Sequence, residues 1–248
     1  MIKIRNLWKR YGKLDVLKGL DLEVKRGEIL VILGRSGVGK SVLLRHIIGI
    51  EKPDQGSIEV EGQIISSLKK NELYGAIRNM GMLFQGSALF DSMNIEENTA
   101  FYLKQHGTPP EEIEKKVFDA LSMVGLSGSE KKMPSDLSGG MRKRAALARL
   151  IVYRPSILLY DEPTTGLDPI TAQQINELIV KTQTELEGTS IVVTHDISSA
   201  LFIADRLALH QDGKIIHVAD PETFLAIDDP TIRFLRENLT IKPRNRNK

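Results

Sequence analysis

The octapeptide GRSGVGKS at residues 34–41 constrains the fold more than any other part of the chain. An apolar run, EILVILG, leads into it, and the mostly apolar stretch SVLLRHIIGI follows. This order of strand, glycine-rich loop and helix builds a phosphate site, because glycines let the backbone wrap around a phosphate and the helix dipole favours its charge. Lys40 would reach the β- and γ-phosphates of a nucleotide, and the Ser41 hydroxyl would ligate Mg²⁺. The residues expected to bind the nucleotide here are Gly34, Arg35, Ser36, Gly37, Val38, Gly39, Lys40 and Ser41.

Three further apolar runs end in polar residues: MGMLFQ at Gln85, SILLYDE at Asp161 and Glu162, and SIVVTHD at His195 and Asp196. Runs that are apolar at every position are typical of parallel strands covered on both faces. In open α/β sheets ligands bind beyond the carboxyl ends of the strands. We therefore expect these side chains to converge beside the glycine loop, with Asp161 near Mg²⁺ and Glu162 able to take a proton from water.

Strand patterns disappear between residues 87 and 155. The segment PEEIEKKVFDALSMVGL begins with proline and acidic residues and has apolar side chains at helical spacing, which predicts a helix. A second amphipathic helix is expected at 171–187. Near the N-terminus, the alternation in LEVKRGEIL and GSIEVEGQII predicts antiparallel strands with turns at Gly27 and Gly62.

These patterns predict one α/β domain over residues 1–248. Its nucleotide-binding core, with an antiparallel β subdomain, would comprise 1–86 and 156–230. A helical subdomain would occupy 87–155, and a basic tail 231–248.

Composition excludes several classes of protein. The chain has no cysteine, which rules out disulfides, cysteine-ligated zinc and thiol catalysis. No apolar run approaches the ~20 residues of a membrane span, and the N-terminus lacks the apolar region of a signal peptide. A net charge of +2 disfavours a broad surface for nucleic acid. We expect a cytoplasmic protein.

A second glycine-rich helix start lies at residues 135–151, SDLSGGMRKRAALARLI. Ser138 can cap the helix, while Gly139 and Gly140 would let backbone amides approach a phosphate. The chain thus carries two phosphate-facing helix starts about a hundred residues apart.

Taken together, these motifs resemble the nucleotide-binding subunit of ATP-binding cassette (ABC) transporters over nearly the full length. The motifs are the Walker A loop at 34–41, the Q-loop glutamine Gln85, the signature LSGGM at 137–141, Walker B at 157–162, the D-loop at 166–169 and the switch histidine His195. The resemblance implies a head-to-tail homodimer in which each ATP lies between Walker A of one chain and the signature of the other. Ser138, Gly139 and Gly140 would then bind the neighbour's ATP.

The same resemblance implies roles for the remaining residues. Gln85 would contact Mg²⁺ or water, Glu162 would be the general base, and His195 would hold the γ-phosphate. Asp168 would bridge the dimer, and Tyr11 would stack on adenine, the alternative for Tyr11 being a turn or core residue.

Met141 stands where most of the family has glutamine, which we interpret as a subfamily trait. The stretches LSGGM with RKRAALAR, MLFQGSALFDSMNIEENTAFYL and DEPTTGLDPIT are similar to the ATPases of the Mla (maintenance of lipid asymmetry) group. Those ATPases work with a permease and an MCE-domain lipid-binding protein to move phospholipid between the two membranes of a diderm envelope, and the group also has a STAS-domain subunit. The resemblance therefore implies a Mg²⁺-dependent ATPase on the cytoplasmic face of the inner membrane that drives lipid transport. Three alternatives remain: an ABC transporter for another substrate, an ABC-fold ATPase acting on DNA or ribosomes, and an ATP-gated clamp without hydrolysis.

Overall fold

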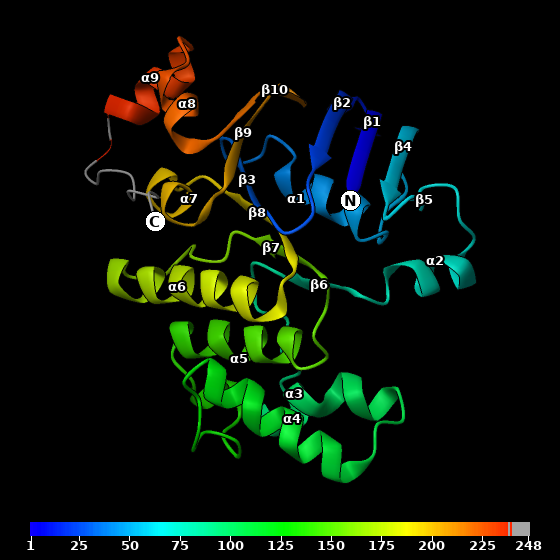
Figure 1. Ribbon diagram of the computed structural model, residues 1–248, viewed down its shortest axis with the longest axis vertical. Coiled ribbons are helices and arrows are strands. Elements are labelled where there is room, and N and C mark those ends of the chain that lie inside the picture. Colours follow the sequence, from blue (N-terminus) through cyan, green and yellow to red (C-terminus); the bar gives the residue numbers. More distant parts are fainter. Residues whose placement is uncertain (238, 240–248) are drawn as a thin grey trace.

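A six-stranded sheet forms the centre of the protein, whose computed structural model describes residues 1–237 and 239 (Figure 1). The strand order is β10-β9-β3-β8-β7-β6. The four apolar runs of the sequence are its adjacent parallel strands β3 (Ile29–Leu33), β8 (Thr189–Thr194), β7 (Ile157–Asp161) and β6 (Met80–Leu83). Every residue of β3, β7 and β8 is buried, as the continuous apolar pattern predicts.

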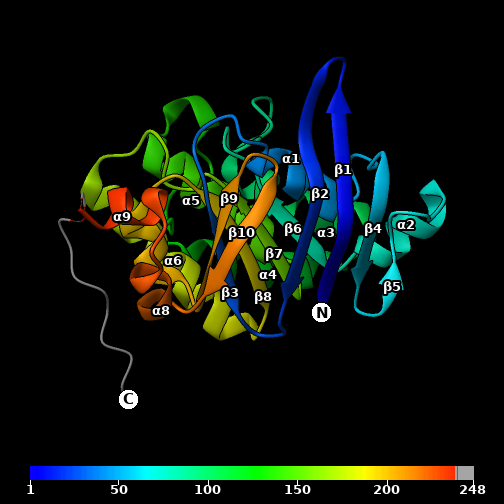
Figure 2. The ribbon, with the colours of Figure 1, turned by 90° about the horizontal axis from the view of Figure 1, so that it is seen from above.

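A smaller antiparallel sheet, with strand order β2-β1-β4-β5, lies beside it (Figure 2). It contains β1 (Ile2–Tyr11), β2 (Leu14–Val24), β4 (Gln55–Val60) and β5 (Gln63–Ile64). Gly62 turns the chain between β4 and β5, as expected. The expectation for Gly27 is half wrong: this residue does turn, with φ 75°, but the strands on its two sides belong to different sheets. β3 pairs with β8 and β9 on its two edges, so it has no edge left for β2.

Helices cover both faces of the central sheet. Helix α1 (Lys40–Ile47) shares a core with the small sheet and with one face of the large sheet. The opposite face packs against the helices α3 (Ile95–Gln105), α4 (Pro110–Met123), α5 (Gly139–Ile151), α6 (Pro169–Leu186) and α7 (Ile197–Ile203). Helices α3, α4 and α5, with the short helix η1 (Pro134–Asp136), form one end of the molecule (Figure 1). The mixed α/β fold with an inserted helical part is confirmed.

The sequence patterns missed several elements. They are α2 (Lys70–Ile77), β9 (Arg206–Gln211), β10 (Lys214–Ala219), α8 (Pro221–Ala226) and α9 (Pro230–Glu237). The hairpin of β9 and β10 turns at Asp212 and Gly213, both at positive φ, and this Asp-Gly pair was a signal for it. The predicted tail is corrected in part, since residues 231–237 belong to α9 and Ile232 is fully buried. Its remainder, 238 and 240–248, lies outside the described residues. Within the described chain, no helix combines the length and apolarity of a membrane span.

Gly81 of β6 lets the helical part pack closely on the sheet. A Cβ at this position would stand 2.2 Å from Leu150 Cδ1 and 2.5 Å from Tyr153 Oη, both carried by or next to α5. The Tyr153 hydroxyl donates to the Met80 carbonyl at 3.2 Å. Strand and helix therefore meet at a distance that only glycine permits.

We expect Gly81→Ala to lower the free energy of unfolding by about 1–3 kcal/mol, the usual cost of overpacking a tight core. Urea unfolding of the purified protein measures it. Gly75→Ala is the matched control, because no atom lies within 4 Å of a Cβ there and the residue is exposed on α2. That variant should gain up to about 1 kcal/mol from helix propensity. Equal stability of Gly81→Ala and the parent would contradict the packing argument.

Candidate nucleotide-binding site

The loop between β3 and α1 is shaped by its glycines. Gly37 and Gly39 have φ 82° and 104°, values that other residues rarely adopt. A Cβ at Gly39 would lie 2.6 Å from Val16 Cγ1, and one at Gly34 would lie 2.7 Å from the His210 carbonyl oxygen. Helix α1 begins without a side-chain cap, so its first amide groups remain for an anion. The loop is thus pressed against β2 and β9 with its amides open to a phosphate.

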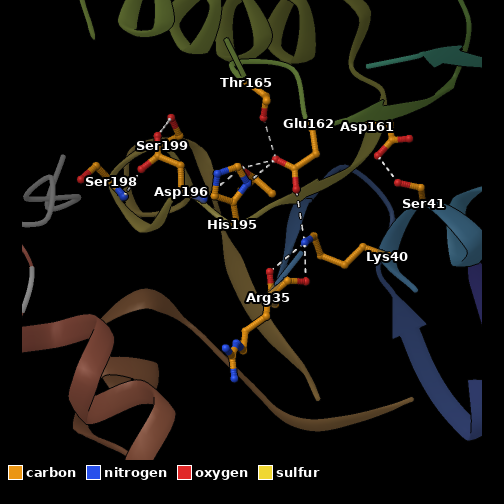
Figure 3. A network of polar contacts seen from close by, with 12 residues as sticks. Arg35, Lys40, Ser41, Asp161, Glu162, Thr165, His195, Asp196, Ser198 and Ser199 are labelled. Atoms are coloured by element: carbon orange, nitrogen blue, oxygen red, sulfur yellow. Dashed lines mark hydrogen bonds and ion pairs between the residues drawn. The ribbon is translucent and has the colours of Figure 1, made fainter. Parts of the chain in front are cut away.

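Lys40 lies across the mouth of this loop (Figure 3). Its ammonium donates to the carbonyl oxygens of Gly34 at 2.7 Å and Arg35 at 3.1 Å. It also pairs with Glu162 Oε1 at 3.2 Å, although only 5% of the lysine side chain is exposed. The loop and the carboxyl end of β7 are therefore joined by one buried ammonium.

The two consecutive carboxylates of the Walker B segment face different partners (Figure 3). Asp161 Oδ1 accepts from the Ser41 hydroxyl at 2.7 Å, and burial raises the pKa of Asp161. Glu162 turns the other way because its backbone is left-handed, with φ 47°. Such a conformation is strained for a glutamate and persists only where the surroundings hold it.

Glu162 Oε2 accepts three hydrogen bonds. The donors are Thr165 Oγ1 at 3.0 Å, Thr194 Oγ1 at 3.4 Å and His195 Nδ1 at 2.9 Å. Because a carboxylate accepts, the last contact places a proton on Nδ1 of His195. Burial acts to raise the pKa of Glu162, but Lys40 and His195 outweigh it and hold that pKa below its ordinary value.

A cavity of about 320 Å³ brings these groups together with Gln85 and Tyr11. The Tyr11 side chain is 41% exposed, and its hydroxyl donates to Glu51 Oε1 at 2.5 Å, so Tyr11 is a wall of the cavity rather than a core residue. The residues that line the cavity are Tyr11, Val16, Ser36, Gly37, Gly39, Lys40, Ser41, Val42, Gln85, Glu162, Thr165 and His195. Asp196, which follows His195, instead caps α7 by accepting from the Ser198 amide at 2.9 Å.

The signature and D-loop residues form a second cluster, and none of them lines this cavity. Ser138 caps α5 by accepting from the Met141 amide at 3.3 Å. A Cβ at Gly140 would lie 2.4 Å from Thr171 Cγ2. Asp168 caps α6 by accepting from the Thr171 amide at 3.0 Å and the Thr171 hydroxyl at 2.6 Å. The N-termini of α5 and α6 are therefore packed together.

Residues 17–165 match the family model described as ABC transporter. The chain belongs to the ABC transporter family.

The solved structures agree with this assignment. A dimeric ATP-binding cassette in a post-hydrolysis state with ADP and phosphate superimposes with a TM-score of 0.82 at 32% identity, covering 89% of this chain and 98% of that one. CbiO1 from Clostridium perfringens, part of the ABC transporter complex CbiONQ, gives 0.84 at 33% identity over 96% of this chain and 95% of its own. The protein is an ABC ATPase that binds and hydrolyses ATP, as predicted.

Curated relatives cover almost the whole chain. The intermembrane phospholipid transport system ATP-binding protein MlaF of Haemophilus influenzae is 42% identical over 95% of this chain and 90% of its own length. MlaF of Escherichia coli K12 is 38% identical over 98% and 91%. The probable ribonucleotide transport ATP-binding protein mkl of Mycobacterium leprae is 39% identical over 98% of this chain and 70% of its own length.

Sequence reasoning missed several residues around the ABC site. Thr165 and Thr194, which hold Glu162, stand next to motif residues, and their hydroxyls were a usable signal. Lys143 interrupts the buried face of α5, where a charged residue is unexpected. His210 lies against the glycine loop, and no local sequence pattern indicates this contact.

His210 should make the stability of this ABC protein depend on pH. Burial, followed by the charge of Lys40, lowers the pKa of His210 from 6.5 to about 4. Between these values the unfolded chain binds a proton that the folded chain does not, so stability is lost as pH falls. From pH 7 to pH 5 this one group costs about 2 kcal/mol.

We therefore expect His210→Leu, which removes the titration, to lose about 2 kcal/mol less than the parent between pH 7 and pH 5. Urea unfolding at both values measures the difference. The comparison cancels the carboxylates, which titrate in both proteins. An identical pH dependence would show that the pKa of His210 does not differ between the folded and the unfolded chain.

Proposed function

We propose that the protein is the ATPase of a phospholipid transporter, and that it works as a head-to-tail homodimer on the cytoplasmic face of the inner membrane, beneath a permease. The observation that carries the ATPase part is the pairing of both Walker B carboxylates with the glycine loop, Asp161 to Ser41 and Glu162 to Lys40. A loop that only bound phosphate would not need a second buried carboxylate held by two hydroxyls and an imidazole.

Ser41 and Asp161 suit Mg²⁺. Both offer hard oxygen atoms, and Mg²⁺ takes few ligands from protein and the rest from phosphate and water. Their 2.7 Å contact shows that the two oxygens already point at one place. Mg²⁺ would neutralise charge on the β- and γ-phosphates. Gln85 lines the same cavity, and its amide oxygen would supply a third contact to the ion or its water.

Glu162 is our general base. Its lowered pKa keeps it ionised at neutral pH, and Thr165 and Thr194 orient the carboxylate. The γ-phosphate would attract the Lys40 ammonium, which would then release Glu162 to accept a proton from the attacking water. Glu162 holds His195 through its Nδ1–H, and Nε2 would then accept a hydrogen bond from the attacking water and position it beside the γ-phosphate. Tyr11 would present its ring to adenine at the outer wall of the cavity.

The separation of the two phosphate-facing helix starts supports a dimer. Ser138, Gly139 and Gly140 lie with the D-loop, away from the cavity of their own chain. The first turn of α5 carries no acidic residue, so its positive helix end suits a phosphate. A second copy turned head to tail would offer that phosphate, and Asp168 would lie at the junction. The Met141 amide is capped by Ser138 and its side chain packs against the helical core, which leaves the phosphate-facing serine and glycines unchanged.

A groove of about 220 Å³ between the Q-loop segment and α5 would be the contact surface for the permease. It is lined by Met82, Leu83, Phe84, Ser87, Ala88, Phe101, Tyr102, Ala146, Arg149, Leu150 and Tyr153. The groove contains aromatic side chains and one arginine, and residues of these types contribute much of the binding energy in protein interfaces. The groove is lined by Phe84 and Ser87, on either side of Gln85 in the sequence, so a permease bound there would act on the nucleotide cavity.

Similarity to the two MlaF proteins favours phospholipid as the substrate. The resemblance of the motifs to the Mla group adds an MCE-domain protein and a STAS-domain subunit to the proposed partners. The resemblance to mkl proteins, at 39% identity, favours a second candidate, an ABC transporter for another substrate. Neither relationship favours a nucleic-acid partner.

Glu162→Gln should lower ATP hydrolysis by at least about 100-fold, because a general base contributes 10²–10⁴-fold. ATP should then accumulate between two chains and hold them together. Phosphate release and light scattering after size exclusion, with and without ATP, measure both effects. Glu111→Gln, an exposed glutamate of α4, is the control and should behave like the parent. Hydrolysis at the parental rate in Glu162→Gln would exclude this residue as the base.

Purification from the native membrane in mild detergent tests the substrate. We expect an Mla-type permease and an MCE-domain protein to accompany the chain, and mass spectrometry identifies them. A permease of another kind would overturn the lipid assignment and leave the ATPase intact. Ribosomal or DNA-bound proteins in place of a permease would contradict the transporter assignment itself.

A further inference from the structure

The backbone just after Gln85 is bent into an uncommon shape. Ser87 and Ala88 have φ 66° and 49°, and the Ser87 amide donates to the Phe84 carbonyl at 2.9 Å. Residues other than glycine avoid this region, so the surroundings must hold the turn. The turn places the Gln85 side chain at the nucleotide cavity.

Two cations from α5 hold this turn. The Lys143 ammonium donates to the Gln85 carbonyl oxygen, and Arg149 Nη1 donates to the Ala88 carbonyl oxygen at 2.5 Å. The Arg149 guanidinium also lies 4.2 Å from the centroid of the Phe90 ring. Arg149 lines the groove proposed for the permease, whereas Lys143 is buried and bonds to the Gln85 backbone.

Lys143 is unusual because it is charged and buried. It is 5% exposed; burial lowers its pKa, and Asp161 and Glu162 act in the opposite direction. Burying an ammonium costs several kcal/mol unless partners repay it. A neutral donor could satisfy one carbonyl with a smaller desolvation penalty. What distinguishes this ammonium is the backbone that it holds, because it donates to Gln85, whose side chain lines the nucleotide cavity.

We propose that Lys143 is a positioning residue that fixes Gln85 in the nucleotide cavity and ties it to the helix that carries Ser138. The inference rests on the proposed function, in which Gln85 serves one ATP and Ser138 the other. Lys143 is five residues beyond Ser138, about 7.5 Å along the helix axis. A shift of the α5 N-terminus toward the neighbour's phosphate would reach the Gln85 backbone through one rigid turn and one side chain.

The competing interpretation is a core lysine that satisfies the nearest carbonyl and has no effect on Gln85. Both interpretations predict some loss of stability on substitution. They differ in whether the loss depends on Gln85 and on Mg²⁺, because only a positioning residue acts through that side chain.

The test is a double-mutant cycle of Lys143→Met and Gln85→Ala, with the affinity for ATP measured in Mg²⁺ and in EDTA. We expect Lys143→Met to weaken ATP binding in Mg²⁺ by roughly 10–100-fold, the usual effect of removing a group that orients a metal ligand. Binding in EDTA should change little. In the Gln85→Ala background Lys143→Met should have no further effect.

Three companion variants complete the design. Lys143→Arg keeps the charge and should restore most of the Mg²⁺-dependent affinity. Lys115→Met, an exposed lysine of α4, should match the parent. Lys143→Gln enters the same cycle if thermal unfolding shows that the methionine variant does not fold.

Equal losses in Mg²⁺ and EDTA, or effects of Lys143 and Gln85 that multiply, would overturn the proposal. These binding measurements need only one chain. Failure of Glu162→Gln to dimerise with ATP would instead contradict the proposed dimer, so the two outcomes are distinguishable.

Discussion

The buried contact between Lys40 and Glu162 is the constraint on which the rest of the structure depends. An ammonium and a carboxylate, both almost fully buried, lie 3.2 Å apart. Each would cost several kcal/mol if it were buried alone, so neither is tolerated without the other and without the surrounding hydrogen bonds. Carbonyl oxygens of the glycine loop accept hydrogen bonds from the lysine. Thr165, Thr194 and His195 donate hydrogen bonds to the glutamate. The fold must therefore bring Lys40 and Glu162, which are 122 residues apart in the chain, to one place.

A parallel sheet meets this requirement because its strands end at a common edge. The glycine loop follows β3, and the two carboxylates lie at the end of β7. His195 follows β8, and Gln85 follows β6. The strands are covered on both faces, by α1 and the antiparallel sheet on one side and by α3–α7 on the other. Burial of whole strands fixes the backbone at that edge, where Glu162 follows β7 in a left-handed conformation.

The sequence predicted the parts whose cause is local. The glycine loop, the four continuous apolar strands and the helical insertion each follow from a pattern within a dozen or so residues, and each is present. The Gly27 turn was misassigned because alternation shows that a strand has two faces and does not show which strand it joins. The contacts of His210 and Lys143 had no signal of pairing, because their partners are more than fifty residues away. The site residues were predictable as motifs, whereas the groups that orient them were not.

Helix α5 connects regions that the sequence treats as separate motifs. Its N-terminus carries Ser138 beside the D-loop. Lys143 and Arg149 donate to the backbone on either side of the turn after Gln85, to the Gln85 and Ala88 carbonyl oxygens. Leu150, near its C-terminus, packs over Gly81, so the helix cannot move without its strand. Helix α5 packs against β6 through Leu150 and against α6 through Gly140, so it is not an independent binding element. The ATP between two chains, the catalytic cavity and the groove for a membrane partner would then share one rigid body, and a change at any of them would be felt at Gln85.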